Sequence, residues 1–157
     1  ISEVKVENRG KRGRRSDQLL KLLKKGHYDE ELQQAQLISL TMGGNDVMKV
    51  VKKDLFNLKR DAFDKELLTY ENRYSKIIDN IRAKNPTVPL LLIGFYNPFS
   101  IVTNEANEFD TIITEWNSVI KKIASKDSND KMTERILAAM EQCKMEQKIN
   151  KEIGFGE

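Results

Sequence analysis

The stretch AQLISLTMGGNDVM, residues 35–48, contains the change of pattern that decides the fold. Its first eight residues are apolar almost throughout, which is typical of a β-strand buried on both faces. Gly43 and Gly44 end this run, and an Asn-Asp pair follows where a helical pattern begins. We therefore predict a buried strand over 35–42, a turn that only glycines can form, and a helix from about Asp46.

Strand and helix patterns alternate upstream of this stretch. Residues 3–7 alternate and predict a strand, and residues 8–15 form a loop with two glycines. Ser16 is a good N-cap for a short amphipathic helix that Gly26 would close. A further helical turn is predicted over 29–34.

The same alternation continues downstream. A long helix is predicted to end at Asn85-Pro86, and residues 88–96 predict a third buried strand. Helices are predicted over 105–124 and 131–148. The long helix and the helix over 105–124 each have an apolar face with spacings of three and four. These faces consist of Leu67, Tyr70, Tyr74, Ile77, Ile78 and Ile81 in the long helix, and of Phe109, Ile112, Ile113, Trp116, Val119, Ile120 and Ile123 in the helix over 105–124. The order predicts a three-layer α/β/α sandwich with a parallel sheet, flavodoxin-like in style.

Composition narrows the class of protein. A length of 157 residues fits one domain, and 39% hydrophobic with 32% charged residues is typical of a globular chain. The net charge of +3 does not by itself indicate a membrane or nucleic-acid partner, and nucleic acid is not expected. The single cysteine, Cys143, excludes an internal disulfide. We expect no metal or organic cofactor, since no cluster has metal-ligand spacing and no glycine-rich phosphate loop occurs.

Polar loops follow the predicted strands, at 8–15, 43–46 and 96–100. The carboxyl ends of parallel strands share one edge of a sheet, where ligands normally bind. Gly13 offers a backbone N–H without a side chain, and Asn45 offers a carboxamide N–H fixed by the glycines before it. Two neutral donors converging on one point would form an oxyanion hole for acyl transfer. The residues alone leave open a helix cap at Asn45 and a simple surface loop at Gly13.

Several segments resemble a known family. GGND, residues 43–46, resembles the third conserved block of the SGNH (GDSL-type) esterases and lipases. VENRGKRGRRSDQLLKLL, residues 6–23, is similar to the second block, whose glycine also serves the oxyanion hole. IRAKNPTVPLLLIGFYNPF, residues 81–99, is similar to a strand and turn of small bacterial lipase/acylhydrolase-like members, and MTERILAAM, 132–140, to the closing helix. The main resemblance covers about residues 3–123.

The resemblance implies a serine esterase or lipase-type acylhydrolase that cleaves a carboxylic ester. Gly13 N–H and the Asn45 side chain would hold the oxyanion, and Gly44 would set the loop geometry. Tyr96 and Phe99, beside a strand end, would contact the substrate. That substrate would be a small ester, a lipid or an acetylated glycan. Family members of this type are often membrane-anchored, which implies an extracellular or membrane-anchored location reached through a segment upstream of Ile1.

Two parts of the family pattern do not occur in this sequence. No Gly-Asp-Ser motif supplies the nucleophile, and the turn SKDSND, residues 125–130, carries no His where the family places its base. We expect a single SGNH-like domain over 1–157 that is incomplete, without its N-terminal serine strand and a segment near 124–131. The tail EIGFGE, 152–157, resembles the run before the family's serine but holds Glu157 and no Ser, so it is interpreted as a terminal tail.

Two other classes of function stay open. One is an inactive scaffold that keeps the fold for partner contact. The other is an anion- or nucleic-acid-binding module that uses the basic loop 11–15, whose affinity would fall steeply with salt. His27, the only histidine, is assigned a structural or surface role, and Asp46 is interpreted as a cap of its own helix rather than as a group that orients a neighbour.

Overall fold

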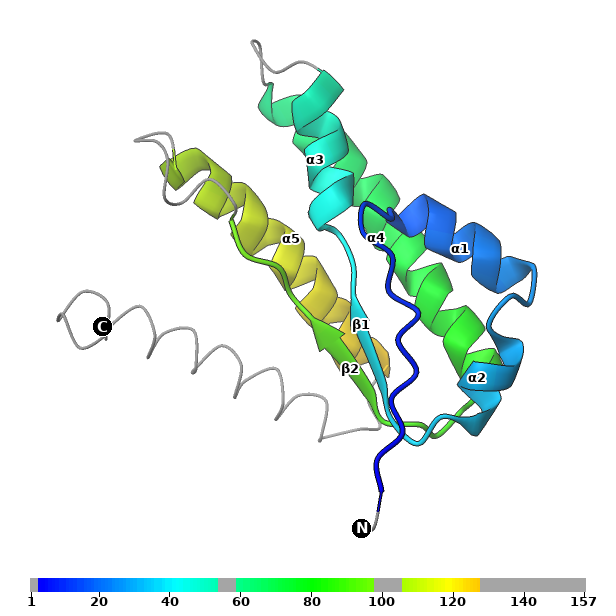
Figure 1. Ribbon diagram of the computed structural model, residues 1–157. Coiled ribbons are helices and arrows are strands. Elements are labelled where there is room, and N and C mark those ends of the chain that lie inside the picture. Colours follow the sequence, from blue (N-terminus) through cyan, green and yellow to red (C-terminus); the bar gives the residue numbers. More distant parts are fainter. Residues whose placement is uncertain (1–2, 54–58, 98–105, 128–157) are drawn as a thin grey trace, which may run out of the picture.

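The computed structural model describes residues 3–53, 59–97 and 106–127, and the statements below refer to these ranges. Helices and strands alternate along the described chain (Figure 1). Their order is α1 (Ser16–Lys24), α2 (Asp29–Gln34), β1 (Ile38–Thr41), α3 (Gly44–Lys53), α4 (Arg60–Lys84), β2 (Leu90–Ile93) and α5 (Ala106–Asp127). The α/β class expected from the sequence is therefore present, with shorter strands than predicted.

The sheet consists of β1 and β2, which run parallel with Ile38 opposite Leu90 and Thr41 opposite Ile93. Leu90 and Leu92 are buried, whereas alternate positions on β1 are exposed. The prediction that the strand over 35–42 is buried on both faces is thus wrong for the described residues. Figure 1 shows α4 and α5 on one side of this sheet, and no described helix covers its other side.

The core lies between the sheet, α4 and α5. The predicted apolar faces of both helices are confirmed, because Tyr70, Tyr74, Ile77 and Trp116 are fully or almost fully buried. The Tyr70 and Trp116 rings are 4.7 Å apart, which joins α4 to α5 beneath the strands. Helix α4 ends at Lys84, before Pro86, as predicted from the restriction that proline places on the residue before it.

Helix α1 begins and ends close to the predicted positions. Gly26 has a φ of 71°, and its N–H donates to Leu23 O at 3.0 Å. The next N–H, of His27, donates to Leu22 O at 3.1 Å, which completes a Schellman motif that ends the helix. At the other end Arg15 takes the N-cap position, and Ser16, the predicted cap, is the first helical residue.

The N-terminal segment differs most from its prediction. Residues 3–7 form no strand, and the side chains of Val4 and Val6 are 75% and 79% exposed. Alternation alone does not make a strand, because a strand also needs a neighbour for its backbone N–H and C=O groups. The predicted helix over 131–148 and the tail 152–157 lie outside the described residues.

Candidate functional site

The loop before α1 presents Gly13 at a tight turn. The N–H of Arg14 donates to Lys11 O at 3.1 Å, and Gly13 has a φ of 79°. A positive φ at the third position of such a turn favours glycine. A Cβ added at Gly13 would meet no atom within 4 Å, so the space beside this residue is open.

The second segment follows β1. Gly43 has a φ of 130°, and its carbonyl accepts the first hydrogen bonds of α3 from Asp46 and Val47, at 2.9 and 3.0 Å. A Cβ at Gly43 would lie 2.5 Å from a ring carbon of Phe95, whereas one at Gly44 would make an ordinary contact of 3.9 Å. We expected Gly44 to set the loop geometry, but the steric constraint lies at Gly43.

Asn45, the second residue of α3, reaches the loop before α1. Its Nδ2 donates to Arg14 O at 3.0 Å, although the two residues are 31 positions apart. The carboxamide therefore lies beside the Arg14–Arg15 peptide and forms no purely local turn. One Nδ2 hydrogen remains for a further acceptor, and within the described ranges no hydrogen bond involves the Gly13 N–H.

Asp46, the residue after Asn45, makes a tertiary contact with Ser16 that was not predicted from the sequence. Its carboxylate is fully buried and accepts hydrogen bonds from the Ser16 N–H, at 3.0 Å, and the Ser16 hydroxyl, at 2.6 Å. Arg73 of α4 also donates to it, at 3.2 Å. Asp46 thus orients the start of α1, contrary to the interpretation as a cap of its own helix. Burial raises the pKa of its carboxyl, while the Ser16 hydrogen bonds and the Arg73 charge oppose that rise.

The two described aromatic residues after β2, Phe95 and Tyr96, differ in their burial. Phe95 is buried against Trp116, with ring centroids 6.5 Å apart, and supports the turn at Gly43. Tyr96, expected to contact substrate, is 77% exposed. Phe99, the other residue expected there, lies outside the described part of the chain.

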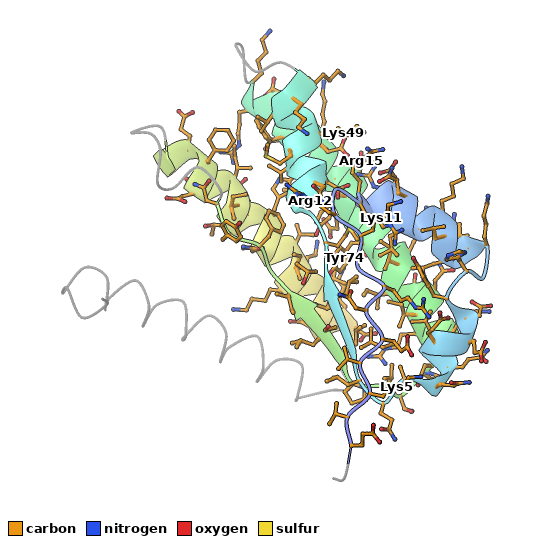
Figure 2. The ribbon with its side chains drawn as sticks, in the orientation of Figure 1. Lys5, Lys11, Arg12, Arg15, Lys49 and Tyr74 are labelled. Carbon is orange, nitrogen blue, oxygen red and sulfur yellow. The ribbon has the colours of Figure 1, made fainter. Side chains whose placement is uncertain are left out.

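Basic side chains surround the loop. Figure 2 shows Lys11, Arg12, Arg15 and Lys49 on the same side of the molecule, near the first turns of α1 and α3. Arg15 is paired with Asp17 at 3.0 Å. Lys11, Arg12 and Lys49 form no ion pair with any residue that the structure describes. We call these three residues the basic rim of the loop.

The described ranges lack two further kinds of feature, a metal-binding cluster and a membrane-spanning helix. They contain no group of three or more His, Cys, Asp or Glu side chains that could hold a metal ion. None of their helices combines the length and apolar character needed to cross a membrane.

Two comparisons with known proteins identify relatives of this chain. Residues 2–132 match the model of the GDSL-like Lipase/Acylhydrolase family. The chain is also similar to the uncharacterized protein YpmR of Bacillus subtilis (strain 168), with 34% identity over 132 residues. That alignment covers 84% of this chain and 52% of YpmR, so the chain spans about half the length of this relative. The chain belongs to the GDSL-like lipase/acylhydrolase family.

Proposed function

We propose that this chain supplies the oxyanion hole of an esterase that hydrolyses a carboxylic ester. The Gly13 N–H and the free Nδ2 hydrogen of Asn45 would donate to the oxygen that becomes negative when the acyl carbon is attacked. A serine nucleophile and a histidine base, aided by an aspartate, would come from outside these 157 residues. The substrate would be a small ester, a lipid or an acetylated glycan.

The observation that carries this proposal is the 3.0 Å contact between Asn45 Nδ2 and Arg14 O. It joins two segments that are distant in sequence, and each segment carries one of the two proposed donors. A structural turn would need neither an open space beside Gly13 nor an unused carboxamide hydrogen. Family membership supports ester hydrolysis at the level of the reaction class.

Asn45→Ala, made in the protein expressed from its complete gene, tests the proposal. The catalytic constant on a chromogenic ester should fall by a factor of about 10² or more, with little change in thermal stability. Asn80→Ala is the matched control, because the Asn80 carboxamide also donates to a backbone carbonyl, Lys76 O at 2.7 Å, but on α4. Equal turnover in the two variants would contradict the assignment.

We also propose that the complete domain is a three-layer α/β/α sandwich. Ser39 and Thr41 are exposed on β1, and Leu91 and Ile93 on β2 are only half-buried. An apolar strand face half open to solvent is typical of a sheet that another layer covers. An experimental structure of the protein from its complete gene, with this face still in water, would contradict the proposal.

A further inference from the structure

A buried polar cluster joins the starts of α1 and α3. It consists of Ser16, Asp46 and Arg73, and the first two are fully buried. Asp46 Oδ2 accepts from the Ser16 N–H at 3.0 Å, and Oδ1 accepts from the Ser16 hydroxyl at 2.6 Å. Buried polar groups of this kind are costly unless every one of them is paired.

Arg73 completes the pairing from α4. Its Nε donates to Ser16 Oγ at 2.9 Å, and its Nη2 donates to Asp46 Oδ1 at 3.2 Å. The same Nη2 also donates to Glu66 on α4. The Ser16 hydroxyl thus accepts from one partner and donates to the other, and both Asp46 oxygens are used. Charge-assisted bonds like these hold their groups in a narrow geometry.

Along the chain, the cluster lies one residue from Asn45 and three residues from Gly13, the two proposed oxyanion donors. Asp46 follows Asn45, and Ser16 is two positions after Arg14, whose carbonyl holds the Asn45 carboxamide. We propose that Asp46 is a positioning residue, which fixes the Gly13 loop against the first turn of α3 through Ser16. This inference rests on the proposed oxyanion role of Gly13 and Asn45. Because Asp46 is fully buried, it would act without touching the substrate.

A carboxylate is suited to this role because it only accepts hydrogen bonds. In Asp46→Asn one oxygen becomes an NH₂ group, which donates, while Ser16 and Arg73 both donate toward the same site. The side chain keeps its volume and loses its matching pattern. We therefore expect the loop to shift or loosen even where the fold survives.

The test compares Asp46→Asn with Asp127→Asn. Asp127 forms a comparable, partly buried ion pair with Arg82 of α4, at 2.6 Å, but at the end of α5. In the 157-residue chain, Asp46→Asn should move the NMR signals of the Gly13 amide and the Asn45 carboxamide. It should also speed hydrogen exchange of the loop about tenfold or more. Asp127→Asn should leave both unchanged while lowering stability.

Activity supplies a second readout, measured on the protein from its complete gene. There Asp46→Asn should lower the catalytic constant by about tenfold or more with a nearly constant KM, because misplaced donors act on the transition state. Ser16→Ala, which keeps the carboxylate, should reproduce the loop shift and covers the case in which Asp46→Asn does not fold.

If the NMR signals of Gly13 and Asn45 were unchanged in both Asp46→Asn and Ser16→Ala, the positioning role of Asp46 would be overturned. An equal shift of these signals in Asp127→Asn and in Asp46→Asn would overturn it too, because the loss of any such ion pair would then be enough to move the loop. A shifted loop in a complete protein that hydrolyses no ester would instead refute the proposed function and leave the positioning role standing.

Discussion

Replacement of Gly43 by alanine should unfold the turn that carries Asn45. The Cβ would lie 2.5 Å from Phe95 Cε1 and 2.7 Å from the Tyr70 hydroxyl oxygen, closer than real Cβ atoms approach. That hydroxyl is itself held, since it donates to Met42 O at 2.8 Å. A φ of 130° adds backbone strain for any residue with a Cβ. Strain of ~1–3 kcal/mol and overpacking of ~1–3 kcal/mol together predict a loss of about 2–6 kcal/mol in the free energy of unfolding.

Gly44→Ala is the control for this prediction. Its Cβ would lie 3.9 Å from Phe95, an ordinary contact, and Gly44 has no positive φ. We expect its free energy of unfolding to stay within about 1 kcal/mol of the parent. Urea denaturation followed by circular dichroism measures both variants, with equal slopes indicating that only stability has changed. A Gly43→Ala protein as stable as Gly44→Ala would refute the steric reasoning.

Two further predictions concern other residues. Tyr74 has a buried hydroxyl without a hydrogen-bond partner in the described ranges, so Tyr74→Phe should raise the free energy of unfolding by about 1 kcal/mol in urea denaturation. A clear loss would indicate a partner outside those ranges. Reversing the charges of Arg12 and Lys49 to Glu should lower kcat/KM for a negatively charged ester about tenfold at low salt, and leave a neutral ester unaffected. An equal effect on both esters would show that the basic rim does not attract anionic groups.

The long helices could be predicted from the sequence because their packing is recorded in local spacing. Tyr70, Tyr74 and Ile77 repeat at intervals that place them on one helix face, and the structure buries that face. The prediction of a strand over 3–7 was wrong because the alternation of apolar and polar residues says nothing about whether a neighbouring strand exists. Val4 and Val6 point to water there.

The candidate site could be predicted only in part, because some of its contacts join residues that are far apart in the sequence. Asn45 and Gly13 were singled out by local pattern and resemblance, and the structure brings Asn45 to the carbonyl of Arg14, the residue after Gly13. The bond between Asp46 and Ser16 spans 30 residues, so no local signal could reveal it. Likewise, two adjacent glycines look alike in sequence, and only the rings of Phe95 and Tyr70 decide that Gly43 carries the constraint.

Phe95, just after the end of β2, packs against the turn at Gly43. The Asn117 side chain of α5 accepts from the Phe95 N–H at 3.1 Å and donates to Phe95 O at 2.9 Å, as a neighbouring strand would. A Cβ at Gly94 would lie 2.8 Å from Asn117 Oδ1, so glycine allows this close approach. The bonds fix Phe95, whose ring then limits position 43 to glycine. We therefore expect the placement of Asn45 to depend on Asn117, through Phe95 and Gly43, as well as on the cluster around Asp46.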